Sequence, residues 1–318
     1  MMDLMELCAM HGSAPMSGGV PAWTLGCFRR RSITFFNGDT DDTTLVVWLQ
    51  SRGLTADLRL AADRPKPKTR EALGDLSLGE LTRLAEVEGG ISHTRFEPTA
   101  SGIELAGTMH WPDWTAFQLH AKWPEPGVLR RVGDCLLEHA PSGAYVEDWR
   151  LQPSGDGPLV GLRLLEERGG KSGQVLHRGG GLVIAGEHAL LVRGRAVELP
   201  PADRLSELLE HALGGRRLLD AIFGFEASYA RRDGTGRYVV AASTSPWREG
   251  QLLLALDGFS LEDGTVVQKA REASGVVERR FRIDTLEPSY EDWLATPATA
   301  AAVDWLATEA STLLRAKP

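Results

Sequence analysis

Short runs of β-branched and aromatic residues recur along this chain, and each run ends in a cluster of turn-forming residues. SITFF stops at NGDTDD, and TTLVVWLQ stops at SRG before LTADLRL begins. Short runs of this kind, interrupted by Gly, Asn and Asp, predict antiparallel strands joined by tight turns. The pattern fills both halves of the chain. We therefore expect a mainly β protein made of two antiparallel β-barrels with a few short helices.

Three segments carry helical spacing instead. Apolar residues recur on one helical face within residues 76–86, and a similar spacing predicts helices at 201–213 and, at the C-terminus, 298–315. Strand content should exceed about 40%, well above the quarter that is usual for mixed proteins. We divide the chain into an N-terminal arm (1–28), a first barrel (29–165) and a second barrel with the C-terminal helix (166–318).

Charge and cysteine content limit the possible binding partners and the cellular compartment. The chain has 318 residues, a net charge of −8 and a pI of about 5.6, and its arginine pairs are scattered. A negative protein without a basic stripe argues against binding to nucleic acid or to an anionic membrane. Three cysteines, an odd and sparse set, predict a reducing, cytoplasmic location without a disulfide framework.

The N-terminus shows no targeting signal and no apolar run of transmembrane length. Five of the six methionines fall in the first sixteen residues, and Gly, Ser and Pro follow. Such an arm is either loosely ordered or packs on a neighbouring molecule. A homodimer is therefore one of the alternatives.

Three stretches carry a family resemblance: RRRSITFFNGDTDDTTLVVWLQSRGLTADLRLAADRP, GAYVEDWRL and VVAASTSPWREGQ. They resemble a group of bacterial proteins similar to a yeast protein made of two lipocalin-like domains. The resemblance spans about residues 30–255 and implies a pair of calycin-type antiparallel barrels. The group has no agreed activity, and the yeast relative is regarded as an interaction partner, so the resemblance bears on the fold and not on a reaction.

Two consecutive predicted strands each carry a polar set on one face. Trp48 and Gln50 share a face of VVWLQ, and Asp57 and Arg59 share a face of TADLRL. Either this face meets solvent or it lines a polar barrel interior. Trp48 favours the interior, because a tryptophan more often lines a cavity than faces water.

A third strand, AYVEDWRL, places Tyr145, Glu147 and Trp149 on one face. Aromatic walls around one acceptor are typical of a small-molecule site, and a surface strand with cross-strand partners is the alternative.

The segment MHWPDWTAFQLHAKW has the densest group of rings in the chain. We expect a turn at Pro112, followed by a strand with Trp114, Gln118 and His120 on a polar face. Its other face should pack in the core.

Motifs for metal and cofactor binding are missing. Four histidines, at 93, 110, 120 and 139, fall on predicted strands, but no HxH, HxxxH or CxxC spacing appears. No dinucleotide loop, phosphate-binding loop or nucleophile elbow is present either. We expect neither a metal nor a cofactor.

These features predict a barrel that binds a hydrophobic or aromatic small molecule, with Arg59 meeting a carboxylate or carbonyl. It could also catalyse isomerisation, cyclisation, hydration or decarboxylation without a cofactor. Glu147 or Asp57 would be the base and His120 the acid. The ligand-binding residues would be Trp48, Gln50, Arg59, Trp114, Gln118, Tyr145 and Trp149. The alternative is a non-catalytic interaction module with filled barrels.

Overall fold

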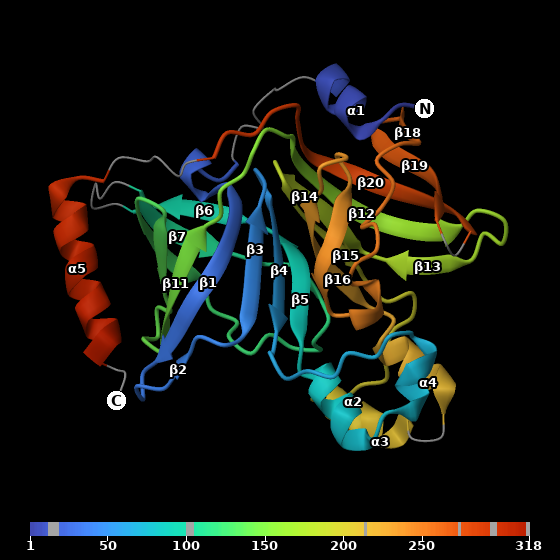
Figure 1. Cartoon of the computed structure of the whole chain (residues 1–318), viewed down its shortest axis with the longest axis horizontal. Helices are drawn as coiled ribbons and strands as arrows, with labels where there is room; N and C mark the ends of the chain where they lie inside the picture. The colour runs from blue at the N-terminus through green and yellow to red at the C-terminus, as the bar shows by residue number, and fades with distance from the viewer. Residues whose placement is uncertain (12–18, 100–104, 213–214, 273–274, 293–297, 316–318) are drawn as a thin grey trace.

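A computed structural model describes residues 1–11, 19–99, 105–212, 215–272, 275–292 and 298–315, with the backbone alone at 310–315. Strands account for 44% of the structure and helices for 18%, so the predicted mainly β class is confirmed. The strands form two curled antiparallel sheets, an arrangement consistent with a two-domain barrel fold (Figure 1). None of the described helices has the length and apolar character needed to cross a membrane.

The first sheet has the strand order β6-β7-β9-β10-β11-β1-β3-β4-β5-β8, with β2 paired to β1. Its strands are β1 (Gly26–Phe35), β2 (Thr40–Asp41), β3 (Leu45–Gln50), β4 (Leu54–Leu60), β5 (Glu88–His93), β6 (Arg95–Pro98), β7 (Ala106–His110), β8 (Thr115–Ala116), β9 (Gly127–Val132), β10 (Cys135–His139) and β11 (Tyr145–Leu151). In the NGD turn after β1, Gly38 adopts φ 88°, a backbone angle that favours glycine.

The first sheet curls until its two ends approach each other. Only Thr94 separates β5 from β6. Through Leu54 and His93, β5 pairs with β4, whereas β6 pairs with β7 through Arg95 and His110. One bent segment therefore joins both ends of the sheet and encloses an interior.

The second sheet has the order β17-β16-β15-β14-β12-β20-β19-β18, with β13 paired to β12. Its strands are β12 (Leu159–Gly169), β13 (Val175–Arg178), β14 (Gly180–Ala185), β15 (His188–Arg193), β16 (Glu226–Arg232), β17 (Tyr238–Ser243), β18 (Phe259–Glu262), β19 (Thr265–Glu272) and β20 (Gly275–Glu287). The chain passes between the sheets after Leu151 and before Leu159, ahead of the division that we expected at 165/166.

The two sheets pack against each other through the outer face of β3 and β4. Leu49 and Leu58 lie in one buried cluster with Val183, Leu190 and Val192 of the second sheet. Because side chains alternate along a strand, the residues between them point into the first barrel. This alternation gives the barrel a polar and aromatic interior behind an apolar exterior.

Helices close one end of this shared core. They are α2 (Leu78–Ala85), α3 (Leu205–Ala212) and α4 (Arg216–Ile222), which lie together below the sheets in Figure 1. A capping box begins α2: the Ser77 side chain accepts from the Glu80 backbone N–H, and the Glu80 carboxylate accepts from Ser77 N–H. The sequence predicted α2 and α3 but not α4; Leu213, the last residue expected in α3, lies outside the described residues. Three short 3₁₀ helices complete the structure: Ala22–Thr24, Glu71–Asp75 and Pro246–Arg248.

Each terminal helix packs against the sheet of the other half of the chain. The N-terminal helix α1 (Leu4–His11) buries Leu4, Leu7 and Cys8 against the second sheet. The C-terminal helix α5 (Ala300–Arg315) lies on the outside of the first sheet, where Trp305 stacks under the Arg130 guanidinium at 3.9 Å (Figure 1). The arm that we expected at 1–28 thus contains a packed helix at its start and the beginning of β1 at its end; residues 12–18 lie outside the described part.

Candidate functional site

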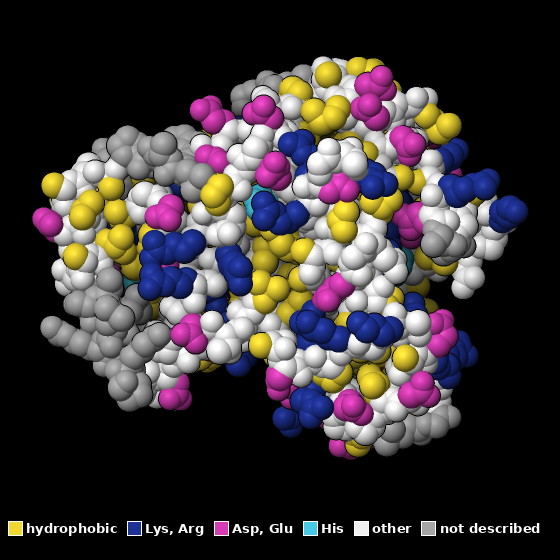
Figure 2. Space-filling model, in the orientation of Figure 1, with side chains coloured by type: hydrophobic (Ala, Val, Ile, Leu, Met, Phe, Trp, Pro, Cys, Tyr) yellow, Lys and Arg dark blue, Asp and Glu magenta, His cyan; other side chains and the backbone are white. Residues whose placement is uncertain are grey.

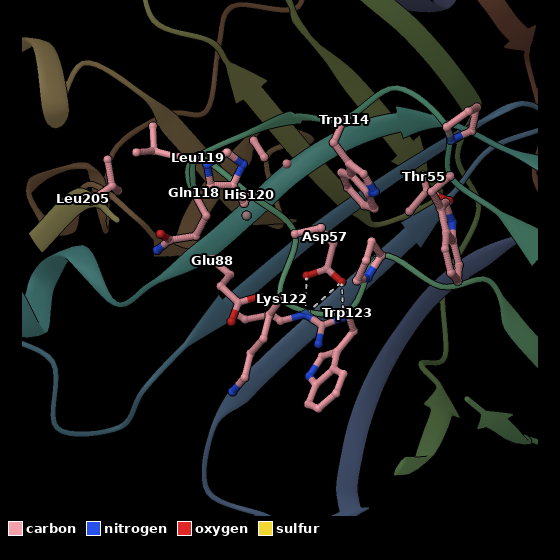
Figure 3. Close-up of a pocket in the computed structure, with 18 of the residues that line it drawn as sticks. Thr55, Asp57, Glu88, Trp114, Gln118, Leu119, His120, Lys122, Trp123 and Leu205 are labelled. Atoms are coloured by element: carbon pink, nitrogen blue, oxygen red, sulfur yellow. Dashed lines mark hydrogen bonds and ion pairs between the residues drawn. The ribbon is translucent and has the colours of Figure 1, made fainter. Parts of the chain in front are cut away.

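A cavity of about 1670 Å³ occupies the interior of the first barrel and continues outward past the loop after β7 toward α2 and α3. Its inner wall is formed by polar and aromatic side chains from β3, β4, β10 and β11: Trp48, Thr55, Asp57, Arg59, Glu138, Tyr145 and Trp149. Figure 3 shows Thr55 and Asp57 in the inner part and Gln118, Leu119 and Leu205 at the opposite, outer end.

Ring contacts fix the aromatic wall. Trp48 stacks on Phe28 with ring centroids 5.0 Å apart, and it meets Trp149 edge-on at 5.5 Å. The indole N–H of Trp149 donates to Glu138 at 3.1 Å. These rings are buried on several sides, so they present a pre-formed surface to anything that enters the cavity.

Gln50 lies behind the wall and does not line the cavity. Its side-chain oxygen accepts from the Trp48 indole N–H at 3.3 Å and from the Thr55 hydroxyl. The Thr55 oxygen also accepts from the Trp111 indole N–H at 3.0 Å. Gln50 therefore helps to position two tryptophans and is removed from direct contact with a ligand.

An ion-pair cluster forms one side of the inner cavity. Arg59 Nη2 lies 3.0 Å from an Asp57 carboxylate oxygen, and Arg59 Nη1 lies 3.5 Å from Glu147. Glu147 is almost fully buried and receives a second guanidinium, from Arg30, at 2.7 Å. Although burial alone would lower the pKa of Arg59, Asp57 and Glu147 raise it well above its usual value.

Arg59 is engaged by the protein's own acids. Its Nε and Nη2 donate to Asp57, and its Nη1 donates to Glu147. Two of its five N–H groups are not used in these bonds, and the side chain is 28% exposed where it lines the cavity. Two carboxylates neutralise its charge, and its expected contact with a carboxylate or carbonyl of the ligand stays a prediction.

Glu138 is the acidic residue that the sequence did not single out. It lies directly opposite Glu147 in the β10–β11 pair, lines the cavity and is 5% exposed. Burial and the neighbouring Glu147 raise the pKa of Glu138 to about 8. A single acidic residue inside the apolar run CLLEH was the available signal.

Tyr145 completes the inner wall. Burial, together with Glu138 and Glu147, raises the pKa of its hydroxyl well above the usual range. Its ring lies 5.7 Å from that of Trp123, which comes from the loop over the cavity. The phenol is therefore neutral and able to donate a hydrogen bond.

The loop after β7 forms the rim of the cavity, and here the expected strand is wrong. β8 contains only Thr115 and Ala116, and the chain then leaves the sheet. The Arg195 guanidinium donates hydrogen bonds to the backbone oxygens of Ala116 and Phe117, at 3.4 and 2.7 Å. In a longer strand these oxygens would accept from a neighbouring strand. Consequently the residues after Phe117 follow the edge of the cavity as a loop.

The three site residues expected in this loop all line the cavity. Gln118 donates to the backbone oxygens of Ala85 and Val87, so its amide is used to tie the loop to the end of α2. His120 is exposed beside Gln118 at the outer end (Figure 3). Trp114 is 39% exposed over β5.

Gly90 allows the close approach of Trp114. A Cβ there would lie 2.7 Å from the Thr115 backbone oxygen and 3.0 Å from the Trp114 ring.

The structure therefore brings most of the expected site together. The expected residues that line the cavity are Trp48, Asp57, Arg59, Trp114, Gln118, His120, Tyr145 and Trp149, whereas Gln50 and Glu147 lie behind its wall.

Metal ligands do not cluster. Within the described part of the chain, no group of three or more His, Cys, Asp or Glu side chains could hold a metal ion. Three of the four histidines that were expected on strands are each near a different carboxylate: His93 at 2.6 Å from Asp113, His110 near Glu97, and His139 near Glu309.

The second sheet has a filled interior. Arg279 is completely buried, and its Nε donates to Glu167 at 2.7 Å. Arg193 lies 3.2 Å from Glu167 and 3.3 Å from Glu226. Although burial alone would raise it, Arg193 and Arg248 lower the pKa of Glu226 to about 2.

The fold also gathers arginines that are scattered in the sequence. Figure 2 shows basic side chains over β1 and β11. Arg29 and Arg31 are exposed there, and with Arg150 they border a shallow hollow of about 360 Å³. Asp148 contacts both Arg150 and Arg31, at 2.8 and 3.8 Å, which reduces the local positive charge.

Comparison with known proteins gives little further information. No family model matches the chain, and no curated protein matches it. Among solved structures, it is similar to the crystal structure of uncharacterized protein YLR301w from Saccharomyces cerevisiae. That comparison has a TM-score of 0.43 and 10% identity, and it covers 81% of this chain and 98% of that chain.

Proposed function

We propose that the first barrel is a lipocalin-like binding site for a hydrophobic or aromatic small molecule. One observation carries the proposal: an open cavity of about 1670 Å³ has tryptophan and tyrosine walls and a buried, hydrogen-bonded cluster of acids at its inner end. Apolar walls with a few convergent polar groups are the usual composition of a small-molecule site.

The same geometry supports acid–base chemistry without a cofactor, of the isomerase, cyclase, hydratase or decarboxylase type. Glu138 is the best proton donor, because its raised pKa keeps it protonated near neutral pH while it faces the cavity. Asp57 faces the same space as an acceptor held by Arg59. Glu147 lies behind the wall, opposite Glu138, and His120 lies at the outer end of the cavity, so their roles as base and acid stay predictions.

The alternative, a non-catalytic interaction module, fits the second half of the chain. Its interior is filled by the Arg279–Glu167–Arg193 network, so any function of this half would lie on its surface.

The proposal is tested by calorimetric titration with a neutral aromatic probe, 1-naphthylmethanol. Saturable binding is expected, and Trp48→Leu should weaken it about tenfold or more by removing a ring wall. Trp23→Leu is the matched control, because Trp23 is buried in the same barrel but does not line the cavity. Absence of saturable binding, or equal loss in both variants, would contradict the proposal.

A further inference from the structure

The inner cavity has an unequal charge balance. The acidic groups around it are Asp41, Asp57, Glu88, Glu138 and Glu147, whereas the guanidinium groups are Arg30 and Arg59. Of these acidic groups, Asp57, Glu88 and Glu138 line the cavity itself. Of the two guanidinium groups, Arg59 lines the cavity and Arg30 does not. The rim carries both signs, but Lys122 extends away from Asp57 (Figure 3).

Both inner guanidinium groups are engaged by the protein. Arg30 donates to Glu147 and to Asp41, each at 2.7 Å, and Arg59 donates to Asp57 and Glu147. An anionic ligand would reach Arg59 only beside Asp57 and Glu147, whose negative charges oppose it. A cationic ligand, in contrast, would meet Glu138 and Glu88 without breaking an ion pair.

We infer that the ligand of the first barrel is an aromatic cation, such as an aryl-alkyl ammonium, whose positive nitrogen lies against Glu138. This inference rests on the proposed function and adds the ligand's charge. Trp48, Trp149 and Tyr145 line the same space, and indole and phenol rings attract cations as well as stack on aromatic groups. A carboxyl beside such rings is the arrangement that selects an organic cation over its neutral analogue.

Binding should release a proton. Glu138 faces Glu147 and Tyr145 on β11, Asp57 and Arg59 on β4, and Gly127 on β9, and the Trp149 indole donates to it. With the carboxyl protonated in the free protein, an ammonium ligand breaks the Glu138 O–H bond. The proton leaves to the buffer, and the ligand stays charged against the new carboxylate.

The test compares three probes of one ring system: 1-naphthylmethylammonium, 1-naphthylmethanol and 1-naphthoate. The ammonium should bind at least about tenfold more tightly than the alcohol at pH near 8, and the carboxylate more weakly than either. Titrations in phosphate and Tris buffers should show proton release for the ammonium alone. Its affinity should rise as the pH increases from about 6.5 to 8, by at most about tenfold per unit.

Two variants locate the charge. Glu138→Gln should reduce ammonium binding to the level of the alcohol and abolish the proton release, while alcohol binding shows that the cavity is intact. Glu262→Gln, an exposed position on β18, should change nothing.

The outcomes separate the two claims. If the alcohol and carboxylate bind as tightly as the ammonium, the inferred ligand charge is wrong and the binding site stands. If Glu138→Gln leaves the preference for the ammonium unchanged, the placement of the positive nitrogen against Glu138 is wrong. If none of the three probes binds, the proposed function fails as well.

Discussion

Glu138 and Glu147 lie directly opposite each other on neighbouring antiparallel strands, with both side chains buried in the first barrel. Like charges at such a distance destabilise a sheet unless one of them is neutralised. Arg30 and Arg59 both contact Glu147, whereas Glu138 accepts from a neutral indole. The asymmetry favours the protonated form of Glu138.

This pair predicts an unusual pH dependence of stability. The pKa of Glu138 rises from 4.5 to about 8 on folding, so below pH 4.5 its carboxyl is protonated in both states. As the pH increases from about 4.5 to 8, only the unfolded chain ionises, and stability is lost. Glu138→Gln should therefore exceed the parent in free energy of unfolding at pH 8, on the order of a few kcal/mol, and lose this advantage toward pH 4.5.

Urea denaturation at several pH values measures this difference, with Glu262→Gln as a control that should follow the parent. A constant difference between Glu138→Gln and the parent across this range would show that the carboxyl does not titrate as described.

Replacement of Arg59 should separate its charge from its packing. Arg59→Ala leaves Asp57 without its guanidinium and should cost about 2 kcal/mol of stability, less than for a fully buried pair because the side chain is 28% exposed. Arg59→Met retains part of the packing and should cost less. Both variants make the cavity more negative, so 1-naphthoate should bind more weakly to them, as calorimetry can show. Tighter binding of the carboxylate probe would mean that Arg59 does not serve mainly to neutralise the acids.

The buried network of the second sheet should be sensitive to loss of one member. Arg279→Ala removes one of the two guanidinium partners of the buried Glu167 and the donor to the Gln268 side-chain oxygen, and should destabilise by about 3 to 5 kcal/mol. Arg280, its sequence neighbour, is 40% exposed and paired with Glu278 at 3.8 Å, so Arg280→Ala should cost under about 1 kcal/mol. Equal destabilisation in chemical denaturation would show that the network contributes no more than a surface pair.

The three thiols should be unreactive in the folded protein. Cys8, Cys27 and Cys135 are buried, and burial raises the pKa of each to about 12. Ellman's reagent should modify them only after denaturation, to the full count of three cysteines per chain. Rapid modification of one thiol under native conditions would show that the helix or strand that carries it opens.

Strand periodicity explains why much of the inner site could be predicted. On β4 the large apolar residues alternate with other residues, so Asp57 and Arg59 had to share one side of the sheet. On β3 the period of two puts Trp48 and Gln50 on one side. Glu138 was not predicted, because its strand, CLLEH, is buried on both faces and shows no alternation of apolar and polar residues. Arg30 was not predicted either, because it is one of three consecutive arginines and the sequence does not show which of them points inward.

The loop over the cavity could not be predicted from its own residues. Its apolar and polar positions alternate as in a strand, but the partners that decide its path lie far away in the sequence. Arg195 binds the Phe117 carbonyl, and the backbone at Ala85 and Val87 binds the Gln118 amide. Such tertiary contacts override local preference, and a single sequence does not reveal them.

The two halves of the chain are held together by α1 and α5, because each of these helices packs on the half to which it does not belong. The helix α1 packs on strands that come much later in the chain, and α5 packs on strands that come long before it. A cut between β11 and β12 would therefore leave each fragment carrying the other's covering helix. The halves should recover full stability only when mixed, as complementing fragments that exchange their ends.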